Sequence, residues 1–378
     1  MKITIITSPF GYLPPNGFGA VESRWYNVAQ EIIKKGHSVS FISKRFNSEK
    51  YDYKDSIIRN EIRGYSRTGS LLKDILLDFI YSLKALYKLE NTDILVMNTF
   101  WSPIFCIFFR KKFRISAYNV ARVPKNQFKF YKHIDRLYCV STPVYKTLLE
   151  QTPSVKTRAK IISNSIDTKV FYFSKKSNEV NKKIRVIYAG RIHPEKGLTI
   201  LIKAINYLKA KYINLELVLI GPSTVEDGGG GDSYINELNR CATNFKIIYL
   251  NPVSDPVLLK NELVKSDIFC YPSIAEKGET FGVAPLEAMA TGTATIVSNL
   301  DCFKDFVLDG INGLIFDHRS DNAVILLAEK IEQLILDKKY RQRLAKEGAK
   351  TALNFSNEII AFEYLKDFEK LLKDRQYD

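Results

Sequence analysis

The chain has 378 residues, which is long for a single hydrophobic core and favours two domains. With 46% hydrophobic and 26% charged residues the composition excludes a disordered protein, and no apolar run reaches the roughly 18–20 residues of a membrane helix. Five cysteines form no C-x-x-C pair, and the start of the sequence is typical of a buried strand rather than a secretory signal. We therefore expect a cytoplasmic protein with reduced thiols.

The first half of the sequence carries the excess positive charge. Residues 1–172 contain 28 Lys and Arg against 13 Asp and Glu, and the remainder contains 28 against 28. This asymmetry predicts that one domain meets a polyanion and the other does not. Nucleic acid, an acidic glycan and an anionic membrane surface remain open as partners on charge alone.

The first half also alternates apolar strands with amphipathic helices. It opens with a β-rich run at 2–7, a Pro/Gly loop, and a helical pattern at 22–37 that ends near Gly36. A second strand and a strongly amphipathic helix follow, and then three short strands. These elements are predicted at 38–43, 71–89, 93–98, 114–119 and 136–141. The order is typical of a doubly wound α/β domain with a parallel sheet.

A polar, charged stretch at 173–183 separates this half from a second alternating run. The predicted strands of that run are 184–190, 215–221, 246–250, 267–273 and 293–298, with a helix at 197–212. We therefore predict an N-terminal domain over 1–172, a linker over 173–183, a C-terminal domain over 184–355, and a helix within 356–378 that packs back on the N-terminal domain. The fold class is α/β, with two Rossmann-like doubly wound domains facing a cleft.

Two basic side chains lie in "YAGRIHPEKGL", the loop after the first strand of the second domain. Arg191 offers a planar fork of donors and Lys196 a mobile charge, and both suit a diphosphate at the carboxyl end of a sheet. On its own, this motif is explained better by a solvated loop that happens to be basic.

A second motif, "ETFGVAPLEAMATG", predicts a Gly-containing turn followed by a helix. Backbone N–H groups of Phe281, Gly282 and Val283 would be free there to bind an anion or a hydroxyl group. Glu287 follows in the helix, where a carboxylate suits the two hydroxyls of a ribose, and Glu279 could reach another part of the same ligand. An ordinary helix with acidic residues near its start is the alternative.

In chain order, "FGAVE", "ISNSID", "GRIHPEKG" and "ETFGVAPLEAMATG" resemble glycosyltransferase family 4 (group 1), whose members are retaining enzymes with the GT-B fold. The resemblance spans nearly the whole chain, and its most specific part is the E-x7-E signature from Glu279 to Glu287. It implies that Arg191 and Lys196 neutralise the donor diphosphate, that Glu287 binds the ribose, and that Glu279 and the following turn contact the transferred sugar. The implied donor-binding residues are Gly17, Gly19, Arg191, Lys196, Leu250, Phe281, Gly282, Val283 and Glu287; the implied catalytic residues are Glu279, Arg191, Lys196 and Asn119.

In the first domain, "PPNGFGAVE" places Gly17 and Gly19 between the first strand and the first helix, where small residues let backbone approach a phosphate. A plain strand-to-helix turn is the alternative. Asn119 ends "RISAYN" where many family members carry a histidine, and an asparagine cannot act as a base. The resemblance then implies that the donor's own phosphate oxygen accepts the acceptor's proton while Asn119 orients hydroxyl groups. Arg122 and Lys125 are candidates for binding an acceptor phosphate, although a solvated basic loop is at least as good an interpretation.

No D-x-D, H-E-x-x-H or paired-cysteine motif is present, so no metal site and no cofactor are expected beyond the nucleotide sugar as co-substrate. The resemblance thus implies a metal-independent hexosyltransferase that moves a sugar, with UDP favoured as the nucleotide, to a glycan or polyprenyl-diphosphate-linked acceptor in bacterial cell-surface polysaccharide biosynthesis. Attachment to the inner face of an anionic membrane is a further hypothesis, based on the basic first half and on aromatic residues beside a basic cluster in 98–116. The alternatives are a GT-B epimerase or phosphorylase and a basic nucleic-acid-binding protein; no reader motif for nucleic acid is recognisable, so no nucleic acid is expected.

Overall fold

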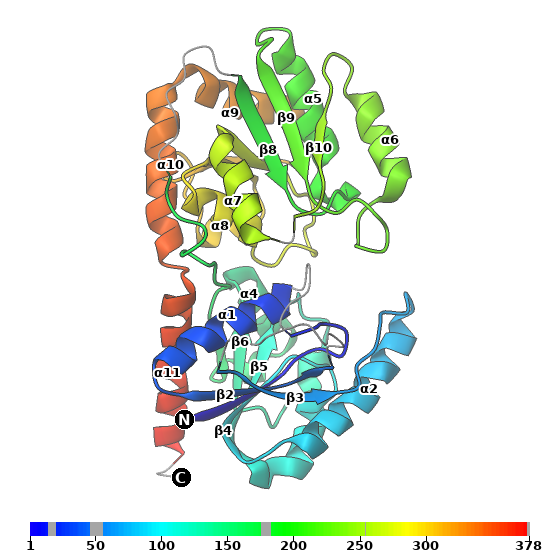
Figure 1. Ribbon diagram of the computed structural model, residues 1–378, viewed down its shortest axis with the longest axis vertical. Coiled ribbons are helices and arrows are strands. Elements are labelled where there is room, and N and C mark those ends of the chain that lie inside the picture. Colours follow the sequence, from blue (N-terminus) through cyan, green and yellow to red (C-terminus); the bar gives the residue numbers. More distant parts are fainter. Residues whose placement is uncertain (14–19, 46–55, 175–182, 254, 376–378) are drawn as a thin grey trace. The chain divides into compact units, whose positions relative to one another are not determined.

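The computed structural model describes residues 1–13, 20–45, 56–174, 183–253 and 255–375 (Figure 1). The chain forms two compact units. The first contains Met1–Ser165 together with Asn357–Asp378, and the second contains Ile166–Ser356. Each unit is built on its own parallel sheet.

The first unit has a seven-stranded sheet in the order β3-β2-β1-β4-β5-β6-β7, with each neighbouring pair parallel. The strands are β1 (Lys2–Ile6), β2 (Ser38–Lys44), β3 (Ile58–Ile62), β4 (Thr92–Met97), β5 (Phe113–Val120), β6 (Arg136–Cys139) and β7 (Ala159–Ile161). The strand order reverses between β1 and β4, so the loops after these two strands leave the sheet at a topological switch point.

The helices of the first unit cover its sheet. They are α1 (Ala20–Lys34), α2 (Leu71–Lys88), α3 (Ser102–Phe105), α4 (Thr142–Gln151), α11 (Asn357–Asp374) and the 3₁₀ turns η1 (Cys106–Lys112), η2 (Gln127–Phe130) and η3 (Pro153–Val155). Helix α11, red in Figure 1, lies against α1, and its Tyr364 ring packs 4.9 Å from both Trp25 and Tyr138. The last helix of the chain therefore completes the core that the first strand begins.

A buried acid fastens α11 to the sheet. Asp367 accepts a hydrogen bond from the Tyr138 hydroxyl at 2.8 Å and pairs with Arg136 at 2.9 Å and Lys160 at 3.2 Å. Asp367 is buried, and the Arg136 side chain is only 12% exposed. The pair is thus shielded from water, and removing its acid would leave a buried cation unpaired.

We expect Asp367→Ala to lower the free energy of unfolding of the first unit by about 3 kcal/mol, the typical cost of breaking a buried ion pair. Both tryptophans of the chain, Trp25 and Trp101, lie in this unit, so tryptophan fluorescence during urea titration reports on it selectively. Asp374→Ala, an exposed acid on the same helix, is the matched control and should change stability by less than about 0.5 kcal/mol. Equal free energies of unfolding for the two variants would contradict the role of Asp367 in docking α11 on the sheet.

The second unit has a six-stranded parallel sheet in the order β10-β9-β8-β11-β12-β13. Its strands are β8 (Ile184–Ala189), β9 (Leu215–Ile220), β10 (Ile248–Leu250), β11 (Ile268–Tyr271), β12 (Ala294–Ser298) and β13 (Leu314–Phe316). Its helical elements are α5 (Leu198–Lys209), α6 (Gly231–Cys241), α7 (Pro256–Lys265), α8 (Val283–Ala290), α9 (Ala323–Leu336), α10 (Lys338–Leu353), η4 (Pro194–Lys196) and η5 (Phe303–Asp305). The prediction of two doubly wound α/β domains is confirmed.

The boundary between the units differs from the expected one. Residues 166–172, predicted to end the first domain, group with the second unit because the Ile166 N–H donates to the Phe355 carbonyl at 2.9 Å and Ile166 bridges to Ser356. Ser174 likewise donates its N–H to Thr291 of that unit. Most of the predicted linker, 175–182, lies outside the described residues.

Candidate active site

Two loops of the second unit carry the residues that the sequence singles out. One follows β8 and the other follows β11, and these strands are neighbours where the strand order of the sheet reverses. Ligands of open α/β sheets bind at the carboxyl ends of strands at such a switch point. The topology therefore brings together residues that lie more than 80 positions apart in sequence.

Gly197 lets the two loops approach closely. It has φ 65°, in the left-handed region, and a Cβ added there would lie 2.2 Å from the Pro272 carbonyl oxygen after β11. The Ile274 N–H also donates to the Glu195 carbonyl at 2.9 Å, which joins the loops directly. Glycine is needed here for its conformation and for its lack of a side chain.

Lys196 and Glu279 meet at this junction. The Lys196 ammonium lies 2.7 Å from the Glu279 carboxylate, and both side chains are largely buried. The ammonium also lies 5.4 Å from the centre of the Tyr271 ring. Burial and then the charge of Glu279 raise the pKa of the Tyr271 phenol above its usual value. The ion pair places a cation and a hydrogen-bond acceptor side by side at the switch point.

Arg191 also has its charge paired. Its guanidinium donates to Glu195 at 2.6 Å and to the Gly228 carbonyl at 2.8 Å. Gly228 belongs to the loop "EDGGGGDS", to which the sequence analysis gives no role. The loop is tied in place, because the Gly229 N–H donates to Thr224 and the Gly230 N–H to Ile192. Sequence reasoning missed this contact, because no spacing rule links position 228 to position 191.

The turn before α8 presents backbone donors. Gly282 has φ 93°, and a Cβ on it would lie 2.4 Å from the Phe303 ring, so a larger residue cannot occupy this turn without displacing that ring. Within the described residues no acceptor contacts the N–H groups of Phe281, Gly282 or Val283. The Phe281 ring itself is buried against Phe306 and Phe355, so it offers a ligand only its backbone.

Glu287 lies one turn into α8 and is only partly exposed. Among the residues that the structure describes, no side chain donates a hydrogen bond to its carboxylate. Burial without a compensating donor raises the pKa of Glu287 to about 8. A ligand with hydroxyl groups would supply the missing donors.

Three further residues of the predicted donor site, Leu250, Gly17 and Gly19, stay predictions. Leu250 ends β10, the edge strand, which β9 separates from β8. It is half-buried at the carboxyl edge of the sheet. Gly17 and Gly19 lie outside the described residues.

Asn119 belongs to the first unit, where it is buried at the end of β5. Its side-chain oxygen accepts a hydrogen bond from the Arg24 guanidinium at 3.0 Å, and its side-chain nitrogen donates one to the side-chain oxygen of Asn98. The same Asn98 oxygen accepts a hydrogen bond from the Trp25 indole. Arg24 is itself buried and contacts Asn164 and Tyr364. These bonds fix the orientation of the Asn119 amide. Sequence reasoning did not anticipate Arg24, since a basic residue in an amphipathic helix normally faces water.

The predicted acceptor residues lie in the loop that follows β5. Arg122 and Lys125 are both exposed. The structure joins neither side chain to Asn119, and each remains a prediction.

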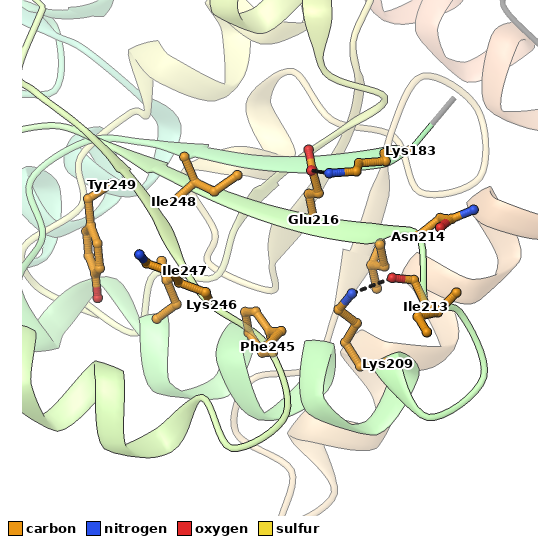
Figure 2. Close-up of a pocket in the computed structure, with 11 residues that line it drawn as sticks. Lys183, Lys209, Ile213, Asn214, Glu216, Phe245, Lys246, Ile247, Ile248 and Tyr249 are labelled. Atoms are coloured by element: carbon orange, nitrogen blue, oxygen red, sulfur yellow. Dashed lines mark hydrogen bonds and ion pairs between the residues drawn. The ribbon is translucent and has the colours of Figure 1, made fainter. Parts of the chain in front are cut away.

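An open pocket of ≈ 680 Å³ lies elsewhere in the second unit (Figure 2). It is lined by Lys183 and Glu216 at the amino ends of β8 and β9, by Lys209, by Phe245 before β10 and by Tyr249 within β10. Because the candidate residues follow the carboxyl ends of the strands, this pocket is not part of the site.

The described residues contain no group of three or more His, Cys, Asp and Glu side chains placed to hold a metal ion. Across the same ranges no helix combines the length and the apolar character needed to cross a bilayer.

Comparison with known proteins agrees with this architecture. Residues 171–351 match the family model described as glycosyl transferases group 1. The capsular polysaccharide biosynthesis glycosyltransferase CapM of Staphylococcus aureus is 29% identical over 198 residues, which cover 52% of this chain and 49% of CapM. The match thus spans about half the length of that curated relative.

Solved structures match over nearly the whole chain. A glycosyltransferase from Rickettsia africae has a TM-score of 0.76 and 20% identity, covering 98% of both chains. HepE of Anabaena in complex with UDP-glucose has a TM-score of 0.72 and 17% identity, covering 98% of this chain and 100% of that one. At this level of identity the likeness establishes the fold, which is GT-B.

Proposed function

We propose that the protein is a retaining, metal-independent hexosyltransferase of family 4. It would transfer a sugar from a nucleoside-diphosphate sugar, with UDP favoured, to a glycan or polyprenyl-diphosphate-linked acceptor in cell-surface polysaccharide biosynthesis. Three features carry this proposal, and all lie in the loops and the helix at one switch point: two cations, a turn whose N–H groups have no acceptor among the described residues, and a carboxylate that receives no hydrogen bond from them. Each of these complements a different part of a sugar nucleotide.

The two cations suit the leaving group. When the bond between the anomeric carbon and the phosphate oxygen breaks, negative charge grows on the diphosphate, and fixed cations stabilise that charge. Arg191 and Lys196 are held now by Glu195 and Glu279. The diphosphate would take the place of these carboxylates, which in the free protein pair the exposed Arg191 and the buried Lys196.

Retention follows if the acceptor oxygen attacks from the face that the diphosphate leaves. The new bond forms between the anomeric carbon and the acceptor oxygen, and the acceptor's proton passes to a phosphate oxygen of the departing diphosphate. No protein base is then required, which fits an asparagine at position 119 whose amide is already engaged by Arg24 and Asn98. Asn119 would act by holding the polar side chains bonded to it in fixed orientations.

Two similar proteins favour this donor and this class of pathway. HepE was solved with UDP-glucose, and CapM acts in capsular polysaccharide biosynthesis. A donor with a ribose also fits Glu287, because the two sugar hydroxyls can donate to its carboxylate.

The direct test is to incubate the protein with UDP-, GDP- and ADP-sugars and measure release of the free nucleoside diphosphate, with and without EDTA. We expect slow hydrolysis of one class of donor, fastest for UDP-sugars, that EDTA does not change. Absence of both turnover and nucleotide binding by calorimetry for all donors would refute the proposal. Loss of turnover in EDTA would refute metal independence alone.

A further inference from the structure

The outer face of α2 exposes large apolar side chains to solvent. Leu72 is 80% exposed, Leu76 59%, Leu83 36% and Tyr87 77%, and Phe108 on the neighbouring η1 turn is 80% exposed. We call these five residues the α2–η1 surface. In Figure 1, α2 lies on the outside of the first unit, with η1 following α3 beside it.

The stripe on α2 follows from helical spacing. Positions 72, 76, 83 and 87 are separated by 4, 7 and 4 residues, so they share one face at about 100° per residue. The face that packs on the unit is a different one and contains the buried Tyr81 and Ala85. Helix α2 therefore has two apolar faces, of which the fold uses one.

The α2–η1 surface is rigidly held rather than loosely attached. The Trp101 indole donates to the Ile75 carbonyl of α2 at 3.0 Å, and the Lys112 ammonium at the end of η1 donates to the Tyr87 carbonyl at 2.9 Å. The Phe79 ring packs edge-on against Trp101 and Phe105. Exposure of the leucines is thus a property of a packed helix.

Basic residues surround the apolar stripe. The two segments 71–88 and 106–112 contribute Lys73, Lys84, Lys88, Arg110, Lys111 and Lys112. Their two acids face inward: Asp78 is buried and accepts from the Phe100 and Trp101 N–H groups, and Asp74 accepts from Thr68 and pairs with Arg67. The exposed part of these segments therefore combines apolar and positive groups without exposed unpaired acids.

We propose that the α2–η1 surface docks the protein on an anionic lipid bilayer, with the leucines and Phe108 entering the interface and the lysines contacting lipid phosphates. Leucine and aromatic side chains beside lysines are what an interfacial helix requires. A second copy of the chain fits less well, because a two-fold contact through this face would set the same six cations against each other. The proposal is independent of the transferase activity.

The test is sedimentation of the full chain with phosphatidylcholine vesicles that either lack phosphatidylglycerol or contain roughly 30% of it, to represent an anionic leaflet. We expect binding to the anionic vesicles only, at least tenfold weaker in 0.5 M salt because the lysine contacts are screened. Leu72→Ser combined with Leu76→Ser is expected to weaken binding at least tenfold, and Lys84→Glu combined with Lys111→Glu to abolish it.

Matched controls come from the second unit: Ile213→Ser replaces a residue that is 84% exposed, and Lys346→Glu replaces an exposed lysine. Both should bind vesicles as the parent does, and the leucine variant should keep the far-ultraviolet circular dichroism spectrum of the parent. Binding that the leucine substitutions leave unchanged would overturn the proposal, since charge alone would then suffice. So would a dimer, seen by light scattering without lipid, that the same substitutions dissociate.

Discussion

Replacement of Lys196 by methionine is expected to lower kcat/KM for the sugar nucleotide about 10²–10³-fold, the usual loss when one group that stabilises charge in the transition state is removed. Methionine keeps the length of the buried side chain but carries no charge to offset that of the departing diphosphate. The fall should appear mainly in kcat, because the charge on the leaving group grows only as the bond breaks. Initial rates of nucleotide release across donor concentrations measure both parameters.

Two further variants make this result interpretable. Lys196→Met leaves Glu279 without its 2.7 Å partner, so the double variant Lys196→Met/Glu279→Gln separates lost catalysis from a buried unpaired acid. Glu195→Gln should act in the opposite direction: it removes the negative charge that now holds Arg191, and nucleoside diphosphate should bind several-fold more tightly. Unchanged kcat in the Lys196 variant, or weaker binding in the Glu195 variant, would contradict the assignment of this pair to the diphosphate.

The second large effect concerns Glu287 and pH. Burial raises the pKa of this carboxyl from 4.5 to about 8, so between these values the folded protein holds a proton that the unfolded chain has lost. Stability contributed by this proton is present at acidic pH and is lost as pH rises toward 8. Glu287→Gln cannot ionise, and we expect it to raise the free energy of unfolding at pH 9 by about 1–3 kcal/mol with little effect at pH 4.5. Urea titrations followed by circular dichroism at the two pH values measure the difference.

Ionisation of Glu287, which lowers stability as pH rises, should raise the affinity for the nucleotide. Ribose hydroxyls donate to the ionised carboxylate, so affinity for UDP should increase as pH rises from 7 to 9 in the parent protein. In Glu287→Gln, affinity should be about tenfold lower at pH 9 and should lose this pH dependence. An identical pH profile for the parent and the glutamine variant, measured by calorimetry, would show that Glu287 does not contact the ligand.

How far the sequence predicts this site depends on whether a residue's partner is set by topology or by local packing. The strand pattern predicted the doubly wound sheets, and parallel topology then required the loops with Arg191 and Glu279 to share one edge. The contact between Arg191 and the Gly228 carbonyl was not predictable, because it depends on the path of an irregular loop. Likewise, nothing in the pattern of α1 indicates that Arg24 is buried against Asn119.

The domain boundary shows the same limit. Polarity placed the linker at 173–183, but the grouping of 166–172 with the second unit rests on a backbone hydrogen bond between Ile166 and Phe355. Backbone pairing of this kind has no compositional signal. The ion pairs that already neutralise Arg191 and Lys196 in the free protein were also not predicted, because the sequence analysis assigns Glu279 only to the ligand and gives Glu195 no role.

The position of α11 sets an order for synthesis on the ribosome. Residues 166–356 are continuous in sequence, so the second unit can bury its core as soon as it emerges. The first unit is translated earlier, yet its core stays open until Ile360, Tyr364 and Phe368 arrive at the very end. The first unit is therefore translated first but completes its folding after the second. A nascent chain stalled before position 357 would contain a folded second unit and an incompletely folded first unit.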